Sequence, residues 1–126
     1  MIAGIGTDIL QISRLARALE RTPRLPERIL TPAELVRFQQ VKDKPRFLAK
    51  RFCAKEAAAK ALGTGIGRGV SWQHMEITSN PEGRPLLMLS EGALARAESL
   101  RVSATHISYS DEQEYVVAFV ILNTDS

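Results

Sequence analysis

Apolar runs along this chain are separated by turn, cap and glycine residues, and together they divide it into helices and strands. The pattern predicts helices over residues 13–21, 32–41, 45–62 and 91–100. It predicts strands over residues 2–9, 72–79, 85–89, 102–110 and 115–122. The order is β-α-α-α-β-β-α-β-β, which favours an α+β fold with a largely antiparallel sheet over a doubly wound fold.

The predicted helix ends depend on a few residues with known capping preferences. Thr31 to Glu34 reads as a capping box with proline at the first helical position. Ser13 and Ser90 are suited to N-cap their helices, and Pro45 can open the longest one. Gly63 is expected to end that helix as a left-handed C-cap.

Glycine and proline mark the other local features. Gly4 and Gly6 lie in the first strand, where we expect a bulge or a close backbone approach. Pro23 and Pro26 are expected to break the helical pattern after the first helix. Residues 80–83 (Asn-Pro-Glu-Gly) predict a type I turn between two strands.

Length and composition are typical of one soluble globular domain spanning residues 1–126, with 44% hydrophobic and 25% charged residues. No apolar run approaches the ~18–20 residues that a membrane span requires, and no signal core follows the amino terminus. We therefore expect a cytoplasmic protein with no membrane partner. Cys53 is the only cysteine and is expected to be a buried, inert thiol.

Charge is distributed unevenly along the chain. Residues 1–68 carry 14 Lys and Arg against 6 Asp and Glu, whereas residues 69–126 carry 3 against 8. A basic amino-terminal half suits an anionic partner, which could be a nucleic acid, a membrane surface, a phosphorylated small molecule or an acidic protein. Charge alone does not choose among these.

Several polar residues are candidates for one chemical site. Phe52, Glu56 and Lys60 are spaced by four, so they lie on one side of the longest helix, where Glu56 and Lys60 would ordinarily form a salt bridge. Asp8 ends the glycine-containing strand, and residues 106–111 concentrate polar groups on another strand. Together these signals favour a shared site over separate structural roles.

Three segments resemble motifs of the holo-acyl-carrier-protein synthases, a group within the 4'-phosphopantetheinyl transferases. They are residues 4–9 (Gly-Ile-Gly-Thr-Asp-Ile), residues 51–61 with the glycine loop 63–67, and residues 106–111 with Tyr115. The resemblance spans the whole chain. It implies the fold of that superfamily and transfer of phosphopantetheine from coenzyme A to a serine of an apo-acyl carrier protein, releasing adenosine 3',5'-bisphosphate.

The resemblance also implies that Asp8 and Glu56 hold Mg²⁺ and that Lys60 contacts the transferred phosphate. The residue types agree, because Mg²⁺ is commonly bound through one or two carboxylates plus substrate phosphates. Glu56 is also the candidate general base, and its ligand and base roles cannot be separated from the sequence.

The remaining site residues follow from the charges of coenzyme A and from the resemblance. Coenzyme A also carries a 3'-phosphate, so further cations are expected beside it, and Lys44 and Arg51 are preferred among Lys42, Lys44, Arg46 and Arg51. Contacts to coenzyme A are thus expected from Lys44, Arg51, Lys60, Gly63, Gly65 and His106. The hairpin residues Arg84 and Pro85 are expected near adenine, and the role of Asp111 stays open. An arginine-rich side of the first helix is expected to dock the acidic carrier through Arg14, Arg21 and Arg24.

The resemblance further implies a homotrimer with sites between subunits. Residues 115–122 are apolar on both faces, as in a strand that is buried on both sides. A single-chain core would explain that strand equally well.

Three other functions remain open at this point. A small basic nucleic-acid-binding domain would explain the calculated pI of about 9.4, although it would not explain Asp8 or Glu56. A coenzyme A-dependent acyltransferase and a phosphopantetheinyl transferase for peptide-synthetase carriers are nearer alternatives.

Overall fold

The computed structural model describes residues 1–125, which form one three-stranded sheet, one two-stranded hairpin and five α-helices. The strands are β1 (Ile2–Gln11), β2 (Met75–Ser79), β3 (Pro85–Leu89), β4 (Val102–Asp111) and β5 (Tyr115–Thr124). The helices are α1 (Ile12–Arg21), α2 (Leu25–Ile29), α3 (Pro32–Gln40), α4 (Lys44–Ala61) and α5 (Glu91–Ser99), with a short 3₁₀ turn η1 (Trp72–His74). The α+β prediction is confirmed, and every strand pair is antiparallel.

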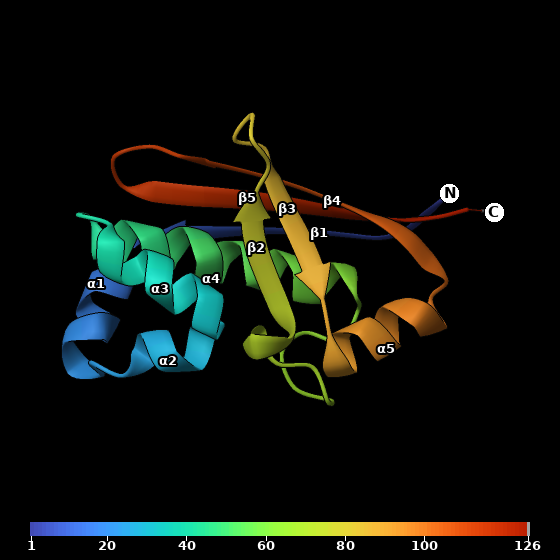
Figure 1. The fold of residues 1–126 in the computed structure, drawn as a ribbon, viewed down its shortest axis with the longest axis horizontal. Helices are drawn as coiled ribbons and strands as arrows, with labels where there is room; N and C mark the ends of the chain where they lie inside the picture. The colour runs from blue at the N-terminus through green and yellow to red at the C-terminus, as the bar shows by residue number, and fades with distance from the viewer. Residues whose placement is uncertain (126) are drawn as a thin grey trace.

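The larger sheet has the order β1-β5-β4, and α4 lies along one of its faces (Figure 1). Helices α1, α2 and α3 gather at one end of α4, α5 lies at the other end, and the β2–β3 hairpin crosses between them (Figure 1). No helix within residues 1–125 lies on the other face of the sheet (Figure 1).

Small residues allow α4 and the sheet to approach closely. A Cβ atom at Gly6 would collide with the carbonyl oxygen of Ala57, and one at Gly4 would collide with that of Ala61. The strand also changes register between Ile2 and Gly4. Both expectations for these glycines, a close approach and a bulge, are therefore confirmed.

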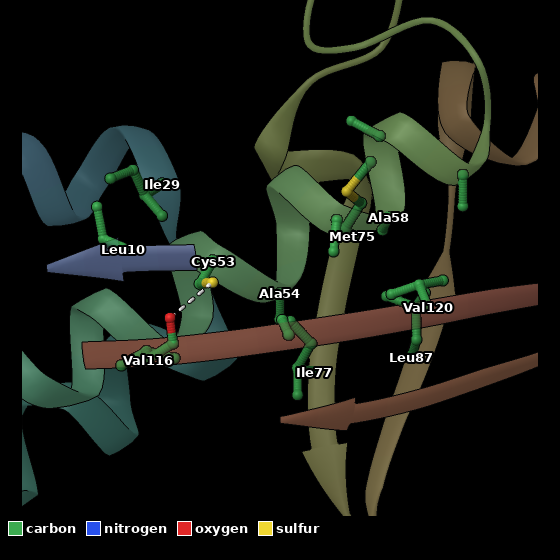
Figure 2. Close-up of a cluster of buried hydrophobic side chains, with 14 of the residues drawn as sticks. Leu10, Ile29, Cys53, Ala54, Ala58, Met75, Ile77, Leu87, Val116 and Val120 are labelled. Carbon is green, nitrogen blue, oxygen red and sulfur yellow. Dashed lines mark hydrogen bonds between the residues drawn. The ribbon is translucent and has the colours of Figure 1, made fainter. Parts of the chain in front are cut away.

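The core lies between α4, the inner face of the sheet and the hairpin. Ala54 and Ala58 of α4 belong to the same buried cluster as Val116 and Val120 of β5 and Met75 of β2 (Figure 2). Burying such apolar side chains is the main source of folding free energy, at about 25 cal/mol per Å².

Two of the predicted helix ends are confirmed in detail. The Thr31 hydroxyl accepts a hydrogen bond from the Glu34 amide, and the Glu34 carboxylate accepts one from the Thr31 amide. Gly63 follows the last residues of α4 with φ of 78°, which is the left-handed conformation expected of it.

Other local predictions were wrong. Helix α1 follows β1 directly, so its N-cap is Gln11 and not Ser13, and the Ile12 amide bonds to the Glu114 carbonyl instead of a cap side chain. Helix α2 was missed because Pro26 was interpreted as a breaker, although proline is tolerated in the first turn of a helix.

Two element starts are also shifted. Residues 72–74 form a 3₁₀ turn and not the start of a strand. Helix α4 begins at Lys44, where the Asp43 side chain caps the Arg46 amide.

The outer face of the larger sheet is apolar and exposed. Its exposed large side chains are Ile5 (57%), Ile9 (66%), Tyr115 (46%), Val117 (42%) and Phe119 (41%). Strand β5 therefore packs on α4 through one face only. The explanation of its two apolar faces by a single-chain core is wrong.

Candidate active site

Asp8 faces α4 from the edge strand of the sheet. It pairs in register with Ala118, whose side chain is buried against α4. The Lys60 ammonium group lies 3.0 Å from Asp8 Oδ1 and donates to the Thr7 carbonyl at 3.0 Å. The Asp8 side chain is 18% exposed and Lys60 is 56% exposed, so solvent reaches this pair.

Glu56 lies one helical turn before Lys60 on the same side of α4. Its Oε2 accepts a hydrogen bond of 2.9 Å from the indole nitrogen of Trp72. The expected salt bridge between Glu56 and Lys60 does not form within residues 1–125, because Lys60 pairs with Asp8. The sequence analysis did not identify Trp72, since no sequence signal connects η1 to α4.

Asp8, Glu56 and Lys60 are therefore gathered at one place. Lys60 bonds to Asp8 from the turn of α4 that follows Glu56, so β1 and this side of α4 meet at the two carboxylates. Two carboxylates with solvent access fit Mg²⁺, which needs few protein ligands when substrate phosphates complete its shell. The donor set is consistent with the predicted metal site.

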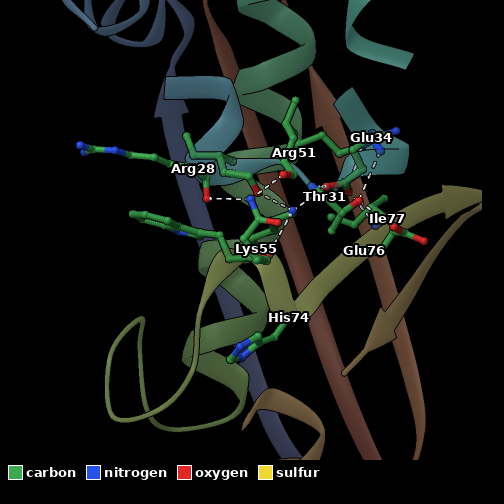
Figure 3. Close-up of polar contacts among 12 residues, drawn as sticks. Arg28, Thr31, Glu34, Arg51, Lys55, His74, Glu76 and Ile77 are labelled. Carbon is green, nitrogen blue, oxygen red and sulfur yellow. Dashed lines mark hydrogen bonds and ion pairs between the residues drawn. The ribbon is translucent and has the colours of Figure 1, made fainter. Parts of the chain in front are cut away.

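Arg51 lies on the opposite side of α4, in a buried charged cluster (Figure 3). Lys55 has no exposed side-chain area, and its ammonium lies 2.6 Å from Glu34 Oε1. Glu34 Oε2 lies 3.6 Å from Arg51 Nε and accepts from the Ile77 amide. Burial lowers the pKa of Lys55 more than Glu34 raises it.

Lys44 and Arg51 therefore do not join Asp8 within this chain. Lys44 donates to the Val41 carbonyl at 2.9 Å, at the start of α4. Arg51 lies over the Phe47 ring, at 4.5 Å from its centroid. It also lines a groove of about 320 Å³ whose other basic residues are Arg37, Arg46 and Lys50.

The glycine loop begins directly after the site helix. Its amides at Gly63, Thr64 and Gly65 already donate to carbonyl groups of α4, at Lys60 for the first and Ala59 for the other two. A role for Gly63 and Gly65 in coenzyme binding would therefore depend on the shape of the loop more than on free amides.

His106 lies on the face of the sheet opposite to Asp8. It pairs with Ile121, while the flanking Val120 and Leu122 are buried against α4. Because side chains alternate across a strand, His106 points to the outer face. It lines a groove of about 420 Å³ together with Arg84 and Pro85.

The arginines of α1 border a groove that leads to the site. Arg14, Arg17 and Arg21 line it around an apolar floor, and its volume is about 400 Å³. The floor includes Leu15, Leu25, Ile29, Phe52 and Trp72. Arg24 lies outside this lining and pairs with Glu27 at 2.9 Å.

Asp111 has a structural partner in this chain. Its carboxylate lies 2.8 Å from Arg46 and 3.5 Å from Lys50, both on α4. Arg46 also donates to the carbonyls of Glu112 and Gln113, so these contacts attach the β4–β5 turn to α4.

Comparison with known sequences gives one consistent family. Residues 4–120 match the 4'-phosphopantetheinyl transferase superfamily. The chain is 53% identical over 124 residues to a holo-[acyl-carrier-protein] synthase of Shewanella frigidimarina, with 98% of both chains covered. It is 53% identical over 123 residues to the enzyme of the same name from Alteromonas mediterranea, again with 98% of both covered.

Solved structures agree with this result. The Neisseria meningitidis holo-[acyl-carrier-protein] synthase superposes with a TM-score of 0.93 at 40% identity, covering 98% of this chain and 100% of that one. The Bacillus anthracis enzyme, in complex with CoA (3',5'-ADP), gives a TM-score of 0.85 at 36% identity, with 99% of both covered. None of the helices in residues 1–125 has the length and apolarity to cross a bilayer.

Proposed function

The chain belongs to the 4'-phosphopantetheinyl transferase superfamily, and from that premise we propose that it transfers phosphopantetheine from coenzyme A to a serine of an apo-acyl carrier protein. The serine oxygen attacks the phosphorus bonded to pantetheine. The bond to the other phosphate breaks, adenosine 3',5'-bisphosphate leaves, and the serine proton passes to a base. The gathering of Asp8, Glu56 and Lys60 is the observation that carries the proposal.

Asp8 and Glu56 would hold Mg²⁺, which when bound supplies a Lewis acid for the phosphorus and offsets charge on the leaving group. Lys60 adds a mobile point charge for the transferred phosphate, since its ammonium reaches Asp8 Oδ1 and remains exposed to solvent. Glu56 Oε2 is bonded to Trp72, so Oε1 is the oxygen that would serve either the metal or the serine proton.

The carrier would dock on the groove of α1. Arg14 and Arg21 border it, Trp72 lies in its floor, and the Trp72 indole contacts Glu56. An acidic helix placed along this groove would bring its neighbouring serine close to the site. Arg24 would add charge from outside the groove, because it is exposed beside Glu27.

We further propose a homotrimer in which the exposed outer face of the sheet is the subunit interface. Large exposed apolar patches mark interaction surfaces, and this face carries Ile5, Ile9, Val117 and Phe119. His106 projects from the same face, so it would reach coenzyme A bound at the site of a neighbouring copy. Lys44 and Arg51 lie on α4, on the other face of the sheet, so they would contact the nucleotide phosphates from the groove that Arg51 lines.

One experiment tests the transfer. Purified protein is incubated with Mg²⁺, coenzyme A and an apo-acyl carrier protein, and the carrier is weighed by mass spectrometry. We expect a gain of one phosphopantetheine that disappears with chelator and in Asp8→Asn and Glu56→Gln, while both variants keep the wild-type circular dichroism spectrum. Wild-type turnover in either variant would defeat the metal assignment.

Subunit mixing tests the shared site. We expect trimers by sedimentation equilibrium, and we expect Asp8→Asn and His106→Ala to be inactive separately. If Asp8 and His106 serve one site from different copies, mixed trimers recover activity, because some sites then contain both native residues. No recovery after verified subunit exchange would place the complete site in one chain.

A further inference from the structure

The hydrogen bond between Trp72 and Glu56 is the contact that the transfer chemistry leaves unexplained. The indole nitrogen donates to Glu56 Oε2 at 2.9 Å, although the two residues lie on different elements. An indole N–H can only donate, so it favours the ionised carboxylate as its partner. The bond engages one carboxylate oxygen and leaves Oε1 free of any hydrogen bond in the described residues 1–125.

The turn η1, which carries Trp72, is held by contacts to two helices. The Trp72 carbonyl accepts from the buried Lys55 ammonium at 3.1 Å. The Gln73 side chain donates to the carbonyls of Glu27 and Leu30 at 2.7 and 2.6 Å. These contacts attach η1 to α4 and α2, so the direction of the Trp72 side chain is set by a rigid backbone.

A reciprocal cap closes the same turn. The Ser71 hydroxyl accepts from the Gln73 amide at 3.1 Å, and His74 Nδ1 accepts from the Ser71 amide at 3.1 Å. The Trp72 ring then packs on Phe52, with ring centroids 5.8 Å apart. Phe52 lies one turn before Glu56 on α4. The Trp72 side chain is therefore held from one side of α4, by ring packing on Phe52 and by its hydrogen bond to Glu56.

We infer that Trp72 is a positioning residue that holds Glu56 Oε2 and thereby presents Oε1 to the divalent cation. The inference rests on the proposed function, because it assumes that Glu56 is a metal ligand. It also divides the two carboxylate oxygens of Glu56 between two tasks: Oε2 is held by Trp72, and Oε1 faces the substrate site. Groups that orient metal ligands commonly change metal affinity 10–100-fold when removed.

The chain offers a sharp way to remove this one hydrogen bond. Trp72 is the only tryptophan in the sequence. Expression in a tryptophan auxotroph supplied with β-(3-benzothienyl)alanine therefore replaces the N–H group by sulfur at position 72 alone, with little change in ring shape. Trp72→Phe is a second variant that keeps an aromatic ring beside Phe52.

The test measures Mn²⁺ binding by electron paramagnetic resonance, with saturating coenzyme A and a protein-free blank. We expect the wild type to bind Mn²⁺, and both Trp72 replacements to raise the dissociation constant about 10-fold or more. Glu56→Gln sets the scale for complete loss of this ligand. Phe52→Leu is the matched control, because it removes the ring contact and keeps the N–H donor, and we expect its Mn²⁺ affinity to remain within about twofold of wild type.

The outcomes separate the inference from its premise. Wild-type Mn²⁺ affinity in the sulfur analogue, together with loss in Glu56→Gln, would overturn the role of Trp72 and leave the metal site standing. An equal loss in Phe52→Leu would assign the effect to packing and would also overturn it. No Mn²⁺ binding by the wild type, or unchanged binding in Glu56→Gln, would overturn both.

Discussion

Lys55 and Lys60 lie on the same helix, five residues apart, and have opposite environments. Lys55 has no exposed side-chain area and pairs with the buried Glu34, while the Lys60 side chain is 56% exposed and pairs with Asp8. Lys60 contacts Thr7 and Asp8 of β1 and is otherwise open to solvent. Lys55, in contrast, is enclosed by α2, α3 and η1.

The difference follows from helix geometry. Successive residues are rotated by about 100° around a helix, so the adjacent Lys55 and Glu56 point to different sides of α4. One side is covered by other elements, and a charge there is useful only as a fixed structural connection. The other side stays open, and there a charge can meet a substrate. One motif therefore contains a structural lysine and a lysine available for chemistry.

Lys55→Met is the largest expected change, and it should act on folding. Removing one partner leaves Glu34 buried with only the 3.6 Å contact to Arg51 as a charge partner. We expect the free energy of unfolding to fall by about 3–5 kcal/mol, measured by urea denaturation at equal protein concentration. The double variant Lys55→Met/Glu34→Leu should recover part of this loss, and a single variant as stable as wild type would contradict the comparison.

Lys60→Met should act on turnover instead. Loss of a positioned cation at the transferred phosphate is expected to lower kcat about 10²–10³-fold. Since the Lys60 side chain is 56% exposed and its ion pair with Asp8 is reached by solvent, the free energy of unfolding should change by about 1 kcal/mol or less. Rates are measured by mass spectrometry of the carrier and stability by urea. A folded variant with normal kcat would show that Lys60 has no role in the transfer.

Cys53 extends the comparison of the two lysines to a third residue of α4, whose side chain is buried and uncharged. Burial raises its pKa from 9.0 to about 12, so the folded protein keeps a proton that the unfolded chain releases in this range. Its contribution to stability is complete below pH 9 and is lost as pH rises towards 12, by at most about 1.4 kcal/mol per pH unit.

The measurement is urea unfolding of wild type and Cys53→Ala across this pH range. The lowered pKa of Lys55 acts with the opposite sign, but it is common to both proteins and cancels in the difference. We expect the wild type to lose stability faster than Cys53→Ala as pH rises. Parallel curves would show that the thiol does not contribute.

Arg14→Ala should give the smallest effect, because it concerns an exposed charge on the groove of α1. We expect KM for the carrier to rise about 2–5-fold, the equivalent of an exposed ion pair worth up to about 1 kcal/mol, with KM for coenzyme A unchanged. Added salt should weaken carrier binding more in the wild type than in the variant. Arg101→Gln, far along the chain before β4, is the control and should leave both constants unchanged.

The fold could be predicted largely from local signals. Three boundaries depend on nearby atoms alone: the capping box at Thr31, the glycine at position 63 and the turn at residues 80–83. The first two have the expected geometry, and the third lies in the turn between β2 and β3. The errors at Pro26 and residues 72–74 were misinterpreted local signals, whereas the error at Ser13 arose where a distant segment decided the helix start. The amide of Ile12, for example, bonds to Glu114, over a hundred residues away.

The candidate site was predicted in part. The resemblance pointed to Asp8, Glu56 and Lys60, and the spacing by four had placed the last two on one helix side. The partner of Lys60 was expected to be Glu56 and is Asp8, since β1 approaches α4 through its glycines. Trp72 and the buried Lys55 cluster had no local signal, because each contact joins elements far apart in sequence.

By itself the sequence determined the residue types, the family and the helical spacing that separates Lys55 from Lys60, because these depend on covalent order and on helix period. Only the tertiary structure decided which side of α4 is covered, which carboxylate Lys60 meets and which face of the sheet His106 and the exposed apolar residues share. The physical reason is that burial and long-range pairing depend on which distant segments pack together, and neither is a property of any segment alone.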